Sequence, residues 1–527
     1  MSEELVKLLD LVLAWERVRD DLADRVFVRH PYEVELMEID RDAWLSELRE
    51  SIRTNRYFPS AMVVCDIPKA KGGIRPGSHL IVADRLVYAA CVGACLEKIN
   101  AEIGWAQGAL DFAYQLAAKP QQRKWLRSQF SGWEEFRERS LRKLEEGYPY
   151  VVIADISSFY DSIDVATLIS DLRQIAAPQA VIEQIGQCVN RWGLVPGRGI
   201  PQGQSASDIL AKLYLNSVDK NLRALGYEHH RYVDDFRIFC RDKAHAKTAI
   251  IDLTRLLRQR GLTLQATKSE IYRADEAREL IEGVLPILKS VSRRFVEQVV
   301  RTSGLGNPYM QVPEADQILM ENPNDAPLEL IRDAYKAYFV DSDDSQFNPT
   351  LFRFLLNRLA KGGDSSAREE CVPLLERHPE ETKTVLKYLG AIDGFSAVED
   401  DLVEFLRSGN AIYTYQTYLI VEWLCEEAAE PSESLLAAIR DIAFDDAQAP
   451  YLQAVARQFI GQFGSPADLE RLEAAYRDAR GPLEQSEIIC SLGRMEKGRR
   501  NAFLARAERD GPLNARAAHW VRRREVW

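Results

Sequence analysis

Hydrophobic and polar positions follow two different patterns along the chain. Up to about residue 285, short runs rich in Val, Ile and aromatic residues stand between longer stretches in which apolar residues recur with the helical period of about 3.6. Beyond that point almost every stretch has the helical period. The pattern predicts an α+β domain followed by an all-α domain.

Four of the short runs are predicted strands, because each is bounded by Pro, Gly or charged residues. They read AMVVCDI, YVVIADI, HHRYVDDFRIFC and LTLQATKSEIY. Residues 165–188 and 243–260 have the helical period and are predicted helices.

The helical second half is punctuated by Pro, Gly and Ser. Residues 396–431, 432–464 and 465–498 each read as a helix, a short break and a second helix, with lengths of about 33 to 36 residues that are typical of stacked helix pairs. We interpret 364–395 as an earlier unit and 499–527 as a shortened basic cap. The pattern predicts an α-solenoid of the HEAT or TPR-like kind.

Composition narrows the classes of protein. The 527 residues are 46% hydrophobic and 28% charged, which excludes a disordered, collagen-like or disulfide-stapled chain. With 68 Lys and Arg against 80 Asp and Glu, the net charge of −12 excludes a protein that coats nucleic acid non-specifically, so any nucleic-acid contact is expected to be local. The eight scattered cysteines lack the spacing of a zinc site, and we expect them to be reduced and mostly buried.

The sequence shows no feature of export or membrane insertion. Its longest uncharged apolar stretch, residues 86–96, is about half as long as a bilayer-spanning helix, and residues 1–10 do not resemble a signal peptide. We therefore expect a cytoplasmic protein with no membrane partner.

Three carboxylates are the strongest chemical signal. Asp234 and Asp235 join the two halves of the run RYVDDFRIF, which predicts a hairpin with both at its tip, although Asp is common in ordinary turns. The run YVVIAD ends on a third carboxylate, Asp155. Three carboxylates at the ends of neighbouring buried strands repel one another unless cations lie between them. We therefore predict two Mg²⁺ ions here, with Mn²⁺ as a substitute.

With these residues in this order, the sequence resembles the right-hand fingers and palm of reverse transcriptases. The resemblance makes Asp155, Ile156, Asp234 and Asp235 the metal-holding positions. Residues 199–207 resemble the loop and helix start that hold the primer terminus and templating base, which gives Gln202 and Gly203 a nucleotide-binding role.

Further segments extend the same resemblance. Residues 67–76 resemble the fingers hairpin, in which Lys69 and Arg75 neutralise the incoming triphosphate, and Lys268 in the following palm motif is a candidate acid for the departing pyrophosphate. Tyr160 lies where reverse transcriptases place a ring under C2′ of the nucleotide, which predicts a preference for dNTPs; ordinary packing is the alternative. No convincing thumb segment follows Lys268.

The motifs PGSHL, DRLVYAA and DISSFY, together with the helical second half, resemble bacterial abortive-infection and other defence-associated reverse transcriptases. This resemblance implies anti-phage defence, DNA synthesis that is template-independent or primed on a protein hydroxyl, a single-stranded DNA product or RNA template, and homo-oligomers formed through the helical domain. The implied domains are fingers and palm (1–285), a helical connector (286–363) and helical repeats (364–527). Two alternatives stay open: a templated enzyme with a dedicated non-coding RNA, and a non-enzymatic nucleotide-binding scaffold that sequesters a phage protein.

Three clusters outside these motifs have both an ordinary and a functional interpretation. Cations and aromatic residues mix in 119–143, as in a single-strand channel or on the basic face of an amphipathic helix. The tyrosines at 413, 415 and 418 supply either a priming hydroxyl or solenoid core. An acidic stretch, 393–446, and a basic tail, 494–524, are either solvated surfaces or a head-to-tail contact between subunits.

Overall fold

The computed structural model describes residues 2–24, 27–119, 122–282, 327–340 and 347–524. The chain divides into two compact units: unit 1 comprises 1–28, 41–64 and 76–282, and unit 2 comprises 29–40, 65–75 and 283–527. Most of the predicted connector, 286–363, lies outside the described residues.

Unit 1 is built around a four-stranded antiparallel sheet. Its strands are β3 (Tyr150–Asp155), β4 (Glu228–Tyr232), β5 (Asp235–Cys240) and β6 (Glu270–Arg273), in the order β4-β5-β3-β6. The single strand predicted over 262–272 is wrong, because a 3-10 turn, Ala266–Lys268, interrupts it. Before the turn, Leu264 forms an isolated bridge with Ile156, and after the turn β6 pairs with β3.

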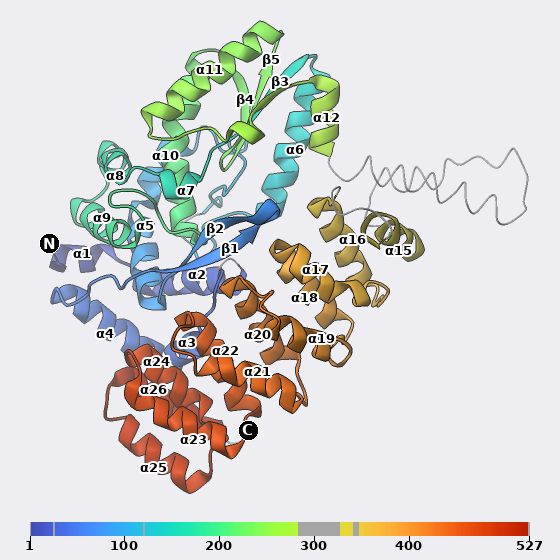
Figure 1. The fold of residues 1–527 in the computed structure, drawn as a ribbon. Helices are drawn as coiled ribbons and strands as arrows, with labels where there is room; N and C mark the ends of the chain where they lie inside the picture. Colours follow the sequence, from blue (N-terminus) through green and yellow to red (C-terminus); the bar gives the residue numbers. More distant parts are fainter. Residues whose placement is uncertain (1, 25–26, 120–121, 283–326, 341–346, 525–527) are drawn as a thin grey trace, which may run out of the picture. The chain divides into compact units, whose positions relative to one another are not determined.

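Helices cover this sheet. Val151 and Phe239, which are register partners on β3 and β5, lie in a buried core with side chains of α6 (Gln129–Glu145) and α12 (Ala274–Glu282). The helix α11 (Lys243–Gln259) also packs on β3 and β5, and Figure 1 shows it on the side away from α12. The sheet is therefore held between helices, and Asp155 lies at the half-buried end of β3.

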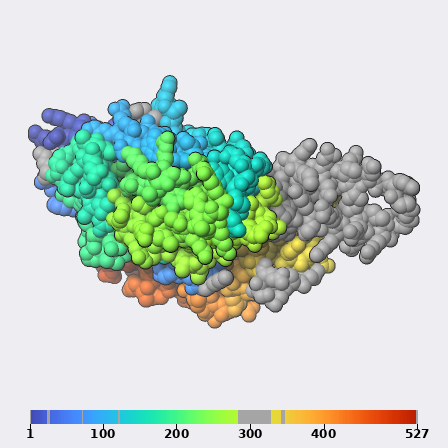
Figure 2. Space-filling model, turned by 90° about the horizontal axis from the view of Figure 1, so that it is seen from above, coloured from blue at the N-terminus to red at the C-terminus, as the bar shows by residue number. Residues whose placement is uncertain are grey.

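Of the remaining helices of unit 1, α2, α9 and α10 contact α5, whose apolar residues face nearly all directions. One helix was predicted over 165–188, and this is wrong: the chain leaves the helix at Ala176, with φ +53°, and restarts after Pro178. Pro disfavours a helical residue before it and therefore breaks the helix. These helices are α1 (Ser2–Leu8), α2 (Leu11–Asp24), α4 (Arg41–Arg53), α5 (Val82–Ile103), α7 (Phe159–Ser162), α8 (Val165–Gln174), α9 (Gln179–Trp192) and α10 (Ser205–Ala224). On the face in Figure 2, the green atoms of residues around 200–280 form one continuous surface.

A separate two-stranded hairpin joins β1 (Val63–Lys69) to β2 (Gly73–His79) through a 3-10 turn, Ala70–Gly72. Gly72 has φ +75°, a conformation that suits glycine. The tip of the hairpin, 65–75, belongs to unit 2, and its base belongs to unit 1.

Unit 2 is helical throughout its described residues apart from the hairpin tip. The predicted helix pairs are present: 396–431, 432–464 and 465–498 contain α19 with α20, α21 with α22, and α23 with α24. Along the chain, α20, α22, α24 and α26 pack one against the next. The unit contains α3 (Glu33–Ile39), α15 (Leu328–Tyr335), the π-helix Lys336–Val340, α16 (Pro349–Lys361), α17 (Cys371–Arg377), α18 (Thr382–Ala391), α19 (Phe395–Arg407), α20 (Thr414–Glu427), α21 (Glu433–Ala443), α22 (Pro450–Phe463), α23 (Pro466–Ala475), α24 (Pro482–Ser491), α25 (Lys497–Ala507) and α26 (Pro512–Arg523), with short 3-10 turns at Arg368–Glu370, Pro379–Glu381 and Tyr476–Asp478.

All eight cysteines are free, and seven of them are buried, which confirms the prediction that most would be buried. Among the described residues, none of the helices combines the length and the apolar character needed to cross a bilayer.

Candidate active site

The turn between β4 and β5 carries two of the three carboxylates. The strand β4 ends at Tyr232 and β5 begins at Asp235, so Val233 and Asp234 form the turn. Asp155, the last residue of β3, is the register partner of Asp235. The structure thus brings Asp155 and Asp235 side by side, with Asp234 next in the chain.

The shape of this turn depends on an unusual backbone conformation. Val233 has φ +57°, a left-handed value that a β-branched residue rarely adopts. Such a conformation costs about 1–3 kcal/mol and persists only where surrounding contacts hold it. Contacts near Val233 therefore decide where the two carboxylates of the turn lie.

Electrostatics confirm that the three carboxylates act on one another. The pKa of Asp235 is raised to about 7, first by burial and then by repulsion from Asp234 and Asp155, against the opposing effect of Arg237 and Lys268. The Lys268 ammonium lies 3.0 Å from Asp155 Oδ2. Burial lowers the pKa of Lys268, but the bond to Asp155 and the attraction of the carboxylates raise it more, so the net shift is upward.

The donor chemistry of this group suits a hard cation. Carboxylate oxygens are the ligands that Mg²⁺ prefers. The pKa of Asp235 is raised first by burial and then by the negative charges of Asp234 and Asp155, and a cation would relieve this repulsion. Within the described part of the chain, no three His, Cys, Asp or Glu side chains converge as a metal-binding group. Asp155, which would share the ion with Asp234 and Asp235, pairs with the Lys268 ammonium instead.

Tyr160 is a buried residue of α7. It is 9% exposed, and its hydroxyl donates to Asp208 Oδ1 at 2.5 Å. Burial and the neighbouring Asp208 raise its pKa well above the usual range, so the hydroxyl stays protonated and keeps donating. The ring is therefore held in one place, and its role beneath the sugar remains a prediction.

Hydrogen bonds hold the loop before α10 at several points. The Gln202 backbone N–H donates to Ser78 Oγ at 3.0 Å, and the Ile200 N–H donates to the Tyr160 carbonyl at 3.0 Å. Gly203 has φ +81°, which favours glycine. These bonds join the loop that contains Gln202 and Gly203 to the backbone at Tyr160.

Residues 67–302 match the sequence model of the family described as reverse transcriptase (RNA-dependent DNA polymerase). The chain contains a reverse transcriptase domain. Its fold is the palm and fingers of that family, and its enzyme class is that of a nucleotidyltransferase, an RNA-dependent DNA polymerase. The match ends within the residues that follow α12.

Solved structures similar to this chain include polymerases from two settings. A chain of a partial Cas6-RT-Cas1–Cas2 complex is 19% identical, with 44% of this chain and 42% of that chain covered and a TM-score of 0.25. The telomerase of Candida albicans, in complex with a TWJ fragment of telomeric RNA, is 12% identical over 68% and 67% of the two chains, with a TM-score of 0.34. Apo telomerase of Candida tropicalis is 12% identical over 82% and 77%, with a TM-score of 0.29. The chain spans about two fifths of the length of the CRISPR-associated protein. No curated protein matches the sequence, so the assignment rests on the family model.

The two residues predicted to bind the triphosphate lie in the hairpin tip. Lys69 ends β1 and Arg75 lies on β2, and both are exposed. They belong to unit 2, whereas the three carboxylates belong to unit 1. Their role in neutralising a triphosphate remains a prediction.

The basic segment 119–143 divides into a buried and an exposed part. Trp125 is 4% exposed and lies beneath the Arg17 guanidinium, 4.5 Å from the ring centre, so it is not free to stack on a base. Trp133 on α6 is 42% exposed and packs edge-on against Tyr232 at 5.1 Å. The ring of Trp133 is therefore an aromatic surface beside the turn that carries Asp234.

The tyrosine cluster of unit 2 is mostly core. Tyr415 is 7% exposed and Tyr418 is 1% exposed, and the Tyr418 hydroxyl donates to Glu422 Oε1 and accepts from the Arg29 N–H. A hydroxyl held in this way is poorly placed to act as a primer, which favours the packing interpretation.

Sequence reasoning missed a set of buried charges under the turn. Arg231, Asp219, Asp111 and Lys212 are all below 6% exposed and are linked by ion pairs. The signal was the charged Arg231 at the end of a predicted strand, immediately before the Tyr-Val-Asp-Asp motif. Its partners come from distant segments, so the sequence alone did not pair them.

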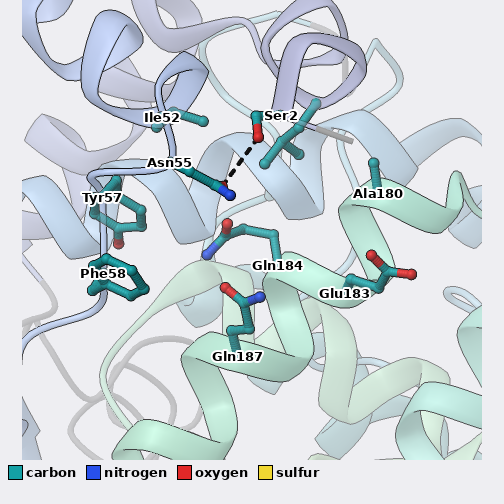
Figure 3. A pocket seen from close by; sticks show the side chains of 10 residues that line it. Ser2, Ile52, Asn55, Tyr57, Phe58, Ala180, Glu183, Gln184 and Gln187 are labelled. Carbon is teal, nitrogen blue, oxygen red and sulfur yellow. Dashed lines mark hydrogen bonds between the residues drawn. The ribbon is translucent and has the colours of Figure 1, made fainter.

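A small pocket of about 120 Å³ lies elsewhere in unit 1, among α1, α4 and α9. Figure 3 shows the side-chain amides of Asn55, Gln184 and Gln187 around it, and Ser2 Oγ donates to Asn55 Oδ1 at 3.0 Å. Among its described lining residues the sole charged side chain is Glu183. Without a cation in its lining, the pocket does not suit a triphosphate.

Proposed function

We propose that the chain is a DNA polymerase whose active centre consists of Asp155, Asp234 and Asp235. The observation that supports this is the pairing of Asp155 with Asp235 at adjacent strand ends, where burial and then the two acidic neighbours raise the pKa of Asp235. Two bound Mg²⁺ ions would activate the 3′-hydroxyl of the primer and stabilise the leaving pyrophosphate. The three carboxylates would hold the ions, with Ile156 as a further metal-holding position.

The remaining residues of the domain position the substrate. Lys268 has a raised pKa and is therefore an ammonium at neutral pH, able to donate a proton to the pyrophosphate. Tyr160 excludes a 2′-hydroxyl through its fixed ring, and the loop at Gln202 and Gly203 holds the base pair. Lys69 and Arg75 neutralise the triphosphate.

We further propose a role in bacterial anti-phage defence, with self-association through the helical second half as an α-solenoid. The helix pairs from α19 to α26, and the sequence likeness to defence-associated reverse transcriptases, support this. Template-independent synthesis is the first candidate activity, and templated synthesis on a dedicated RNA is the second. Light scattering on the full chain tests self-association: a monomer at micromolar concentration contradicts it.

Incubation of the protein with each dNTP separately, with and without an RNA template and primer, tests the activity. A polymer formed without template supports template-independent synthesis, and one that needs RNA supports templated synthesis. The variant Asp234→Asn/Asp235→Asn is expected to form neither product, whereas Asp275→Asn, an exposed carboxylate on α12, keeps full activity. Nucleotide binding without incorporation in the wild type would favour the scaffold alternative.

A further inference from the structure

A fully buried guanidinium lies directly beneath the catalytic turn. Arg231, the residue before Tyr232 on β4, is 1% exposed. Its Nη2 donates to Asp219 Oδ2 at 2.7 Å and to Asp111 Oδ2 at 2.9 Å, and its Nε donates to Asp219 at 3.1 Å. Each of these bonds joins Arg231 to a buried carboxylate of unit 1.

The remaining donor of Arg231 reaches the turn itself. Its Nη1 donates to the carbonyl oxygen of Val233 at 2.9 Å. Val233 is the residue with φ +57°, and it separates Tyr232 from Asp234. The guanidinium thus holds the one peptide whose conformation sets the direction of the two following carboxylates.

Rigid elements fix the position of Arg231 in turn. Asp219 and Lys212 lie on α10, and Lys212 also donates to Asp111 Oδ2 at 2.6 Å. The Arg231 backbone N–H donates to the Leu110 carbonyl at 2.7 Å, and the Phe112 N–H donates to the Arg231 carbonyl at 3.0 Å. The side chain and the backbone of Arg231 are therefore both anchored by bonds other than the one to Val233.

Stability alone does not explain such a cluster. Buried ion pairs are often replaceable by apolar residues of similar volume with no loss of stability. A planar fork with donors on several sides can bridge two carboxylates and a carbonyl at once, which Lys cannot do. The arrangement is specific to holding a backbone oxygen at a fixed place.

We propose that Arg231 is a positioning residue, which holds the Val233 peptide in its left-handed conformation and thereby aims Asp234 and Asp235 at the reacting groups. This inference rests on the proposed polymerase function of those carboxylates. In this role Arg231 contacts neither substrate nor metal and acts through the Val233 peptide.

The test compares three variants of the full chain. Arg231→Lys keeps the charge but loses the fork, and is expected to lower kcat about 100-fold, the scale on which small misplacements of reacting groups act, with little change in the KM for dNTP. Lys212→Met removes a charge from the same cluster but leaves the bond to Val233, so it lowers the melting temperature and leaves kcat near the wild-type value. Adding Val233→Gly to Arg231→Lys recovers much of the lost kcat, because glycine adopts φ +57° without strain.

Hydrogen exchange in the absence of nucleotide and metal gives a readout that does not depend on activity. Exchange in the peptide spanning 231–237 is expected to be faster in Arg231→Lys than in the wild type and unchanged in Lys212→Met. If Arg231→Lys does not fold, Asp219→Asn, which weakens the ion pair that holds Arg231, takes its place. Exchange in the same peptide is expected to be faster in this variant than in the wild type.

Equal exchange in all folded variants, or no recovery of kcat with Val233→Gly, overturns the inference. If the wild type polymerises nothing but the exchange difference is present, the polymerase proposal fails and the positioning of the turn stands.

Discussion

Acid is expected to weaken unit 1 through one buried carboxylate, Asp219. Burial alone would raise its pKa, but the Arg231 guanidinium and His229 lower it more, to about 2 against an ordinary value of 3.8. A shift of this size corresponds to about 2 kcal/mol of folding free energy, at about 1.4 kcal/mol per pKa unit. Because the folded-state pKa is depressed, this contribution is present above about pH 4 and is lost as the pH falls through about 2.

The variant Asp219→Asn isolates that contribution. At pH 7 it leaves Arg231 with only part of its negative partners, and breaking a buried pair in this way costs about 3–5 kcal/mol. As the pH falls from 5 to 2, the wild type loses its advantage from Asp219 while the variant has nothing there to lose. The difference in unfolding free energy between the two proteins therefore shrinks by about 2 kcal/mol.

Urea unfolding from pH 2 to pH 7 measures this difference, followed by far-ultraviolet circular dichroism and by hydrogen exchange in 205–240. Other carboxylates titrate equally in both proteins and cancel in the comparison. Asp252→Asn, a carboxylate on the outer helix α11, is the matched control and is expected to show a difference that changes little over the same range. A gap between wild type and Asp219→Asn that stays constant down to pH 2 would refute the reasoning.

Three further outcomes are expected. Tyr160→Ala lowers the ratio of dNTP to rNTP incorporation efficiency by opening the space beneath C2′; an unchanged ratio in single-nucleotide assays shows that the ring is only packing. Lys268→Ala slows incorporation. In the wild type, the rate declines at high pH as Lys268 loses its ammonium proton, and the raised pKa of Lys268 puts this decline above the ordinary pKa of Lys. The variant is expected to lack the decline, and a pH–rate profile that keeps it contradicts the acid role. Tyr418→Phe loses the bonds to Glu422 and Arg29, with about 1 kcal/mol of stability lost for each bond, but is expected to keep any covalent attachment of DNA to the protein. If protease treatment of the product shows that the variant carries no attached DNA where the wild type does, the assignment of Tyr418 to the core is wrong.

The placement of the three carboxylates at strand ends could be predicted because these residues carry local signals. An apolar run that ends on Asp155 and a pair of Asp between two apolar runs are visible in sequence, and the strands β3, β4 and β5 follow them closely. The helix pairs of the second half are equally visible, because Pro, Gly and Ser stand at their boundaries. In both cases the information lies within a few residues of the element.

The features that sequence did not reveal depend on contacts between distant segments. Asp111 reaches Arg231 across 120 positions, and only folding shows that they meet. Lys212 and Asp219 are seven residues apart, which places them on one face of α10, but this spacing does not predict which strand packs against that face. The burial of Trp125 under Arg17 is likewise a tertiary fact, and it removes this ring from the surface of the cation-rich and aromatic segment 119–143.

The backbone bridge between Arg231 and residues 110–112 has a consequence for solubility during folding. β4 lies at the edge of the four-stranded sheet, and an uncovered edge offers free backbone groups to strands of other molecules. The segment 110–112 forms backbone hydrogen bonds to Arg231 on that edge. Helix α6 lies so close to this segment that a Cβ on Gly132 would meet the Phe112 carbonyl oxygen at 2.4 Å. The segment 110–112 therefore shields this edge strand at Arg231 from pairing with strands of other molecules, and a side chain at position 132 would push the segment away from the edge.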